Sequence, residues 1–135
     1  ETIIDRYRLV KKYGIRVAAY NIIGLPGETR REIFDTIEMN RKVNPDSFSV
    51  TMLEPYRGTH IRSLCEEEGL DPNHETVYNK AQFVPKGIKK SELLGLFRAF
   101  PLYVRLPRNR FDEIRSAETN DDVYRRLISE LGLGS

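Results

Sequence analysis

Two short loops hold most of the residues of this chain that are suited to binding a ligand. The first, Gly24 to Thr29, follows a nearly continuous apolar stretch and precedes a predicted helix. Glycines let a ligand approach the backbone closely, and a helix start offers amide donors and a positive dipole end to an anion. Glu28 is suited to accept a hydrogen bond from an ammonium group or a ribose hydroxyl. The alternative is a plain turn from strand to helix, with a cap and no ligand.

The second loop, Glu54 to Thr59, follows a stretch in which apolar and polar residues alternate. Tyr56 is suited to stack on a base or another ring, and Arg57 is suited to meet a carboxylate or a phosphate. Parallel strands end at the same edge of a sheet, where α/β proteins bind their ligands, so we expect the two loops to lie together. The alternative for this loop is a rigid turn that caps the next helix.

The elements that position these loops follow from the hydrophobic periodicity. Up to Gly69 the chain is predicted to form helix, strand, helix, strand and helix, with one complete βαβ crossover. The apolar stretch Ile15 to Ile23 is typical of a parallel strand that is covered on both faces. The other predicted elements are a helix over residues 1–13 that the chain enters midway, a helix from Thr29 to Asn44 with a capping box between Thr29 and Glu32, a strand from Ser47 to Met52, and a helix from Thr59 to about Glu68.

The composition of the chain changes after Gly69. Residues 71–90 are polar and without a clear period, and we predict a long connection there. A helix opens at Ser91, and Pro101 is expected to kink it or end it. A short segment around Phe111 follows, and then a last helix that Thr119 or Asn120 caps. We therefore divide the chain into residues 1–70, a βαβ segment, and residues 71–135, a connection with a helical carboxyl-terminal extension.

The overall composition excludes several classes of protein. With 135 residues, 39% of them hydrophobic, the chain is long enough to bury a core without disulfides. Its 22 basic and 20 acidic residues leave a net charge of +2, which favours neither nucleic acid nor an anionic membrane as a partner. No apolar run is long enough to span a membrane, and the first residues are unlike a signal or transit peptide. The single cysteine, Cys65, fits a reducing compartment, and we expect a cytoplasmic protein.

Isolated polar residues elsewhere in the chain carry weaker signals. Cys65 is expected to be a buried, inert thiol. His60 and His74 have no partner at metal-ligand spacing, so we expect no zinc site and no cysteine-held cluster within this chain. No residue stands out as a catalytic acid, base or nucleophile. A group of arginines forms either a nucleic-acid face or a salt-bridged surface, and the acidic residues interleaved with them favour the second: Arg98, Arg105, Arg108 and Arg110.

The order of the loop motifs resembles the second half of a radical S-adenosylmethionine domain. The resemblance is closest to the cobalamin-associated and methylthiotransferase-like branch, often labelled Fe–S oxidoreductases. It rests on the Gly24-to-Thr29 loop, the Asn44-Pro45-Asp46 turn and the Pro55-to-Thr59 loop. Arg57 departs from this branch, which usually has proline at that place. Residues 91–118 resemble the helical tail of the same branch, so the resemblance covers about three-quarters of the chain.

This resemblance implies the carboxyl-terminal part of an open (β/α)6 barrel, with about two parallel strands and their helices, plus a helical extension. It implies a larger protein with a [4Fe–4S] cluster and, in part of the branch, cobalamin. Such enzymes cleave S-adenosylmethionine reductively and transfer a radical or a methyl group to a substrate, here expected to be a small molecule. The cluster is held by a Cys-x3-Cys-x2-Cys loop that this sequence lacks, so we expect the chain alone to be inactive. The implied S-adenosylmethionine-binding residues are Gly24, Leu25, Pro26, Gly27, Glu28, Thr29, Thr51, Leu53, Pro55 and Tyr56.

The first residue is not Met, and we expect the chain to be part of a longer protein. Two parallel strands are too few for an independent sheet, and each would present an unpaired edge. We therefore predict that the chain self-associates through these edges. Two other classes of function stay open. One is a (β/α) barrel enzyme whose Gly24-to-Thr29 loop binds phosphate, and the other is a non-catalytic interaction module that docks through the helices of residues 91–131.

Overall fold

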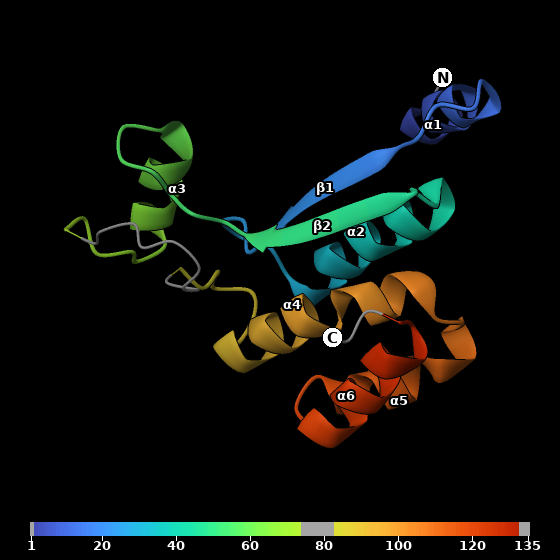
Figure 1. The fold of residues 1–135 in the computed structure, drawn as a ribbon. Helices are drawn as coiled ribbons and strands as arrows, with labels where there is room; N and C mark the ends of the chain where they lie inside the picture. The colour runs from blue at the N-terminus through green and yellow to red at the C-terminus, as the bar shows by residue number, and fades with distance from the viewer. Residues whose placement is uncertain (1, 74–82, 133–135) are drawn as a thin grey trace.

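The computed structural model describes residues 2–73 and 83–132, whose arrangement is shown in Figure 1. His74 and the middle of the predicted 71–90 connection lie outside the described residues. The elements are, in chain order, α1 (Ile3–Lys12), β1 (Ala18–Ile23), α2 (Arg30–Val43), β2 (Ser47–Met52), α3 (His60–Glu67), α4 (Lys90–Arg105), the 3-10 turn η1 (Arg108–Arg110), α5 (Phe111–Ala117) and α6 (Asp121–Glu130).

In the part of the chain that the structure describes, β1 and β2 form a parallel sheet of two strands. The pairing runs from Ala18 opposite Ser47 to Ile23 opposite Met52. Helix α2 connects the two strands, and α4 packs beside α2 beneath the same face of the sheet (Figure 1). The predicted α/β class and βαβ crossover are therefore confirmed.

Local capping explains where the helices begin and end. The predicted capping box at the start of α2 is present, because the Thr29 side chain accepts from the Glu32 amide and the Glu32 carboxylate accepts from the Thr29 amide. Asn44 ends α2 with a left-handed φ of 48°, which lets the chain turn into Pro45. The expectation that the chain enters its first helix midway is wrong, because Thr2 caps α1 through a capping box of its own with Asp5.

The apolar core lies between the covered face of the sheet and the helices. Ile23 of β1 and Phe48, Val50 and Met52 of β2 meet the buried faces of α2 and α4, and α5 and α6 close the far side of α4. Phe48, Val50 and Met52 are partly buried, whereas Ile23 and the inner faces of the helices are fully buried, and this burial is the main stabilising term of the fold. The members that are fully excluded from solvent include Ile23, Ile33, Ile37, Leu93, Leu96, Phe100, Leu102, Ile114 and Leu127.

The opposite face of the sheet is bare, which corrects the prediction of a strand covered on both faces. Tyr20 is 86% exposed and Ile22 is 51% exposed, and along both strands exposed residues alternate with more buried ones. The strand also begins at Ala18, so Ile15 lies outside it and is exposed. The apolar stretch led to a prediction of two packed faces because apolar residues favour burial. The sequence does not show, however, whether another element packs on each face. Within the described residues, both packing helices lie on one side.

Pro101 does not end α4, contrary to one of the two expected outcomes. The helix continues through it to Arg105. Proline removes one backbone hydrogen bond, but Phe100, Leu102 and Tyr103 on either side are fully buried in the core. Their packing holds the helix together across the missing bond. The last helix begins as predicted, with the Asn120 side chain accepting from the amides of Asp122 and Val123.

One buried polar network ties α2, α4 and the end of α5 together. The Glu118 carboxylate receives both terminal nitrogens of Arg30, at 2.9 and 2.6 Å, and the Tyr103 hydroxyl at 2.6 Å. Gly95 makes room for it, since a Cβ there would lie 2.8 Å from the Glu118 Cβ. Burial and the bond to Glu118 raise the pKa of Tyr103 above its ordinary range, so the hydroxyl stays protonated and donates. The bonds between Arg30 and Glu118 join residues 88 positions apart.

None of the helices in residues 2–73 and 83–132 has the length and apolar character needed to cross a membrane.

Candidate functional site

The two predicted loops meet at the carboxyl edge of the sheet. The Leu53 amide donates to the Ile23 carbonyl at 2.9 Å, so the strands stay paired up to the point where both loops begin. A Cβ at Gly24 would lie 4.0 Å from the Leu53 nitrogen, which brings the first loop against the second. The predicted site residues Gly24, Leu25, Pro26, Gly27, Glu28 and Thr29 lie between β1 and α2, Thr51 lies on the bare face of β2, and Leu53, Pro55 and Tyr56 follow β2.

Glu28 shapes the first loop instead of facing outward. Its carboxylate accepts from the amides of Gly24 at 2.5 Å and Leu25 at 3.1 Å, and the residue is only 8% exposed. Gly24 and Gly27 have positive φ values of 83° and 75°, which this tight turn requires. Burial raises the pKa of Glu28, and the two amide bonds oppose that effect. One carboxylate oxygen, Oε2, is therefore engaged within the loop, and the ammonium or ribose contact of Glu28 stays a prediction.

The raised pKa of Glu28 predicts a pH-dependent stability. A carboxyl whose pKa is higher in the folded state than in the unfolded chain binds its proton more tightly when folded. Its contribution to stability is therefore present below the ordinary glutamate pKa and is lost as pH rises through the folded value. Glu28→Gln keeps an acceptor oxygen for the two amides and removes this dependence.

The measurement is urea unfolding of the protein and the Glu28→Gln variant between pH 4 and pH 7. Other carboxylates act equally on both proteins, so they cancel in the difference. We expect the stability of the wild type relative to the variant to fall as pH rises. A difference that is flat or that rises with pH would contradict the burial of this carboxyl.

The start of α2 is covered by a segment that follows the undescribed residues. At Gly87 a Cβ would lie 2.9 Å from the Thr29 side chain and 3.1 Å from the Glu28 carbonyl, so the backbone there touches the first loop. The Lys86 amide donates to the Glu68 carboxylate at 3.2 Å. The helix start is thus closed by its own cap and by this packing. The alternative of a phosphate held at α2 stays a prediction.

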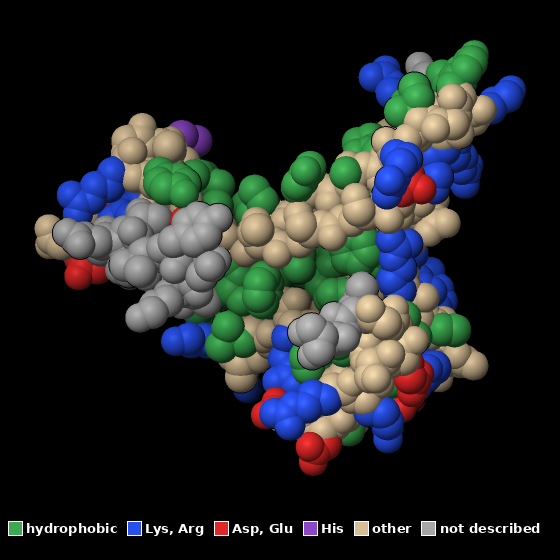
Figure 2. All heavy atoms as spheres, in the orientation of Figure 1, with side chains coloured by type: hydrophobic (Ala, Val, Ile, Leu, Met, Phe, Trp, Pro, Cys, Tyr) green, Lys and Arg blue, Asp and Glu red, His purple; other side chains and the backbone are tan. Residues whose placement is uncertain are grey.

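The bare sheet face leads directly into the two loops. Ile22 is paired with Thr51 close to the carboxyl edge, and Tyr20 is paired with Ser49 two residues earlier on the same face. The Thr51 hydroxyl donates to the Asn21 carbonyl at 3.4 Å. Tyr56 is 56% exposed, and its hydroxyl donates to Glu54 at 3.1 Å. Hydrophobic side chains stand along the face between α3 and α1 in Figure 2. The surface offers apolar contact together with hydroxyl groups.

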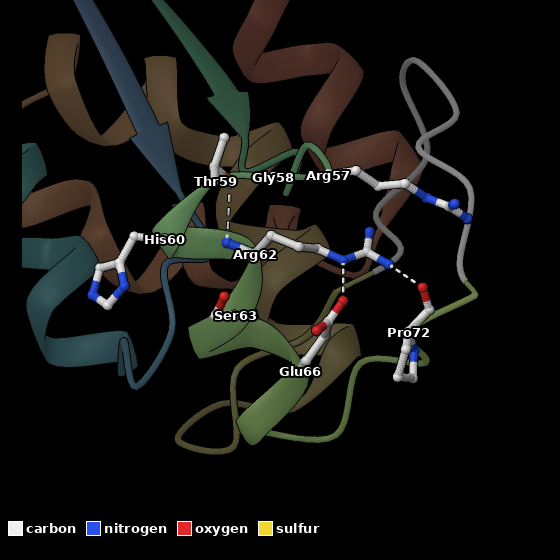
Figure 3. Close-up of a pocket in the computed structure, with 8 residues that line it drawn as sticks. All are labelled: Arg57, Gly58, Thr59, His60, Arg62, Ser63, Glu66 and Pro72. Atoms are coloured by element: carbon white, nitrogen blue, oxygen red, sulfur yellow. Dashed lines mark hydrogen bonds and ion pairs between the residues drawn. The ribbon is translucent and has the colours of Figure 1, made fainter.

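A pocket of about 370 Å³ lies behind the second loop. Arg62, which the sequence analysis did not single out, is 3% exposed and holds this region together (Figure 3). It pairs with Glu66 at 2.7 Å and donates to the carbonyls of Pro55 at 3.1 Å and Pro72 at 3.0 Å. In the sequence, the spacing of four residues between Arg62 and Glu66 on a predicted helix is the signal that could have indicated this ion pair. The pocket is lined by Arg57, Gly58, Thr59, His60, Arg62, Ser63, Glu66 and Pro72.

The described residues offer polar, apolar and aromatic contacts but no group suited to a metal ion. No group of three or more His, Cys, Asp or Glu residues in residues 2–73 and 83–132 is placed to hold a metal ion. Cys65 is fully buried, as predicted, and burial raises the pKa of its thiol, which makes it a poor ligand. The described chain therefore does not fit an iron–sulfur cluster. Ile22 and Thr51 on the bare face offer apolar and hydroxyl contacts, and the exposed Tyr56 of the second loop offers an aromatic ring.

The chain is similar over part of its length to a known protein. A protein of Pyrococcus horikoshii named "uncharacterized methyltransferase" is 38% identical to this chain over 58 residues. The matched segment makes up 43% of this chain and 13% of that protein, so the chain corresponds to a small part of the relative's length. No family model matches the chain.

Proposed function

We propose that this chain forms two neighbouring strand–helix units in the wall of a larger (β/α) barrel, and that the barrel is a radical S-adenosylmethionine enzyme. One observation carries the proposal: the sheet has helices on one face, a bare face on the other, and two adjacent loops at the carboxyl edge. A barrel wall has this construction, with helices outside, side chains pointing inward and ligands at the carboxyl ends of the strands.

In this proposal the chain binds and orients S-adenosylmethionine in a methyl-transferring reaction. The similarity of its segment to a protein named as a methyltransferase supports this choice. Tyr56 stacks on the adenine, Thr51 offers its hydroxyl, and Ile22 gives an apolar wall. The Gly24-to-Thr29 loop, held by Glu28, fixes the edge against which the ligand lies. When bound, S-adenosylmethionine supplies the group that is transferred.

In this proposal the other implied cofactors are held by other parts of the native protein. A [4Fe–4S] cluster and cobalamin would rest on residues outside this chain, because its described residues do not fit a cluster. We place the protein in the cytoplasm, where a free thiol such as Cys65 stays reduced. The predicted self-association through strand edges stays a prediction for the isolated chain, since further strands of a barrel would cover the same edges.

The test is amide hydrogen exchange of the whole native protein with and without S-adenosylmethionine. We expect slower exchange in two separated segments, residues 20–29 and 49–56, which meet at the carboxyl edge of the sheet. The helices of residues 108–130 lie away from this edge and should exchange equally in both samples. Protection confined to other parts of the protein, with these two segments unchanged, would overturn the proposal.

A further inference from the structure

A cluster of positive side chains surrounds the turn between α2 and β2, at the opposite edge of the sheet from the candidate site. Lys11 donates to the Asn44 carbonyl, and Arg105 donates to the Asn44 side-chain oxygen at 3.0 Å and the Pro45 carbonyl at 2.8 Å. Figure 2 shows Lys and Arg side chains gathered below α1, on the side where β1 begins. We call this group the basic cluster, and its members are Lys11, Lys12, Arg16, Lys42 and Arg105.

The charge of the basic cluster is only partly balanced. Asp46 is the acidic residue of this turn, and its carboxylate is held by the Val17 amide at 2.7 Å. That bond, and then the charges of Lys11 and Arg16, lower the pKa of Asp46, so it is ionised at neutral pH. The oxygens that receive Lys11 and Arg105 are neutral, and neutral acceptors satisfy a hydrogen bond without cancelling its charge. Lys11 and Lys12 lie in the last turn of α1, Lys42 lies in the last turn of α2, and Arg16 and Arg105 lie beside the turn that follows α2. In a chain of net charge +2, this grouping is a strongly uneven distribution of charge.

The arginines first considered for a nucleic-acid face behave differently. Arg98 pairs with Asp121 at 2.8 Å, Arg108 pairs with Glu38, and Arg110 pairs with both Glu113 and Glu130. Three of the four are thus salt-bridged, as the interleaved acidic residues predicted. Arg105 is the exception, and it belongs to the basic cluster.

Exposed aromatic surface lies within the same cluster. Tyr13 is 74% exposed and stands in the chain between Lys12 and Arg16, both of them exposed. Arg105 lies 5.0 Å from the centre of the Phe48 ring, so its guanidinium is held flat against an aromatic face. Cations that meet phosphates, with an aromatic ring on which a base stacks, are the combination that single-stranded nucleic acids require. An acidic protein surface would need the cations but not the exposed ring.

We propose that the basic cluster binds the phosphate backbone of a single-stranded nucleic acid, with Tyr13 stacking on a base. The inference does not depend on the proposed S-adenosylmethionine site, which lies at the other edge of the sheet. Binding here is sequence-tolerant, because phosphates and base faces are common to every sequence. Its strength falls with salt, because each phosphate contact releases condensed counterions.

The test uses a fluorescein-labelled single-stranded RNA of 20 nucleotides and the whole native protein, with fluorescence anisotropy read at several salt concentrations. The variant K12Q/R16Q/K42Q removes three cations of the basic cluster whose side chains are exposed. We expect its affinity for the RNA to fall on the order of 100-fold at 0.1 M salt. The salt slope, which is the slope of the logarithm of the binding constant against the logarithm of the salt concentration, should become shallower by roughly 2. The matched control K90Q/R115Q/R125Q makes the same change of net charge elsewhere on the surface and should bind within about threefold of the wild type.

Tyr13→Ala separates stacking from charge. It should weaken RNA binding about tenfold while leaving the salt slope unchanged. The proposal is overturned if the two triple variants lose affinity equally, since net charge alone would then explain binding. It is also overturned if the protein does not bind the RNA, or if an acidic peptide or an anionic vesicle competes at lower concentration than unlabelled RNA. S-adenosylmethionine binding measured on the same variants should be unchanged.

Discussion

Replacing Glu118 with alanine is expected to lower the free energy of unfolding by about 3 kcal/mol, at the low end of the range for breaking a buried ion pair. The side chain of Glu118 is 7% exposed and that of Arg30 is 23% exposed. Without the carboxylate, the guanidinium stays largely buried without its strongest partner, and the Tyr103 hydroxyl loses its acceptor. Both groups then bear the cost of burial without compensation. Urea unfolding followed by circular dichroism measures the loss.

Three further variants show whether the network is the cause. Glu92 lies 4.0 Å from Arg30 and is 39% exposed, so Glu92→Ala should cost about 0.5 kcal/mol or less. Tyr103→Phe removes only the hydroxyl and should cost about 1 kcal/mol. In the double variant with Glu118→Ala, that cost should largely disappear, because the hydroxyl has no acceptor left. A loss below about 1 kcal/mol for Glu118→Ala would mean that the three groups do not depend on one another.

Local signals in the sequence predict most of the elements of this fold. The Thr29–Glu32 capping box, the Asn44-Pro45 stop and the Asn120 cap all act within a few residues, and each appears as expected. The errors concern the environment of an element. The chain around Pro101 stays helical because distant residues pack on Phe100 and Tyr103. Ile22 is exposed because, among the described residues, the helices pack on the other face of the sheet. Periodicity reports a preference for burial, whereas burial itself depends on the whole protein.

The same distinction between local and long-range effects applies to the candidate site. That both loops share one edge followed from the rule that parallel strands end together, and the contact between Gly24 and Leu53 agrees with it. The role of Glu28 could not be predicted, because its acceptor geometry depends on the two positive φ values around it. The contact of Gly87 with Thr29 and the pair of Arg30 with Glu118 join residues 58 and 88 positions apart, and no short-range pattern predicts such pairs.

Thr51→Arg is expected to weaken binding of S-adenosylmethionine to the whole native protein by about 100-fold or more, which corresponds to about 2.7 kcal/mol. Thr51 is exposed on the bare face, opposite Ile22 and one residue before the end of β2. A long side chain there occupies the surface on which the ligand is proposed to lie. Its guanidinium also repels the sulfonium charge of S-adenosylmethionine. Isothermal titration calorimetry measures the affinity.

Ser47→Arg is the matched control for this prediction. Ser47 lies on the same face of the same strand, four residues earlier, and its side chain is also exposed. At about 3.3 Å per residue the two positions are about 13 Å apart, so the added arginine stands at the amino edge, away from both loops. Its effect on affinity should stay within about threefold, and both variants should unfold within about 0.5 kcal/mol of the wild type, as surface changes usually do. If both arginines weaken binding equally, or neither does, the ligand does not lie at the carboxyl edge of this face, and the proposed orientation of the barrel wall is wrong.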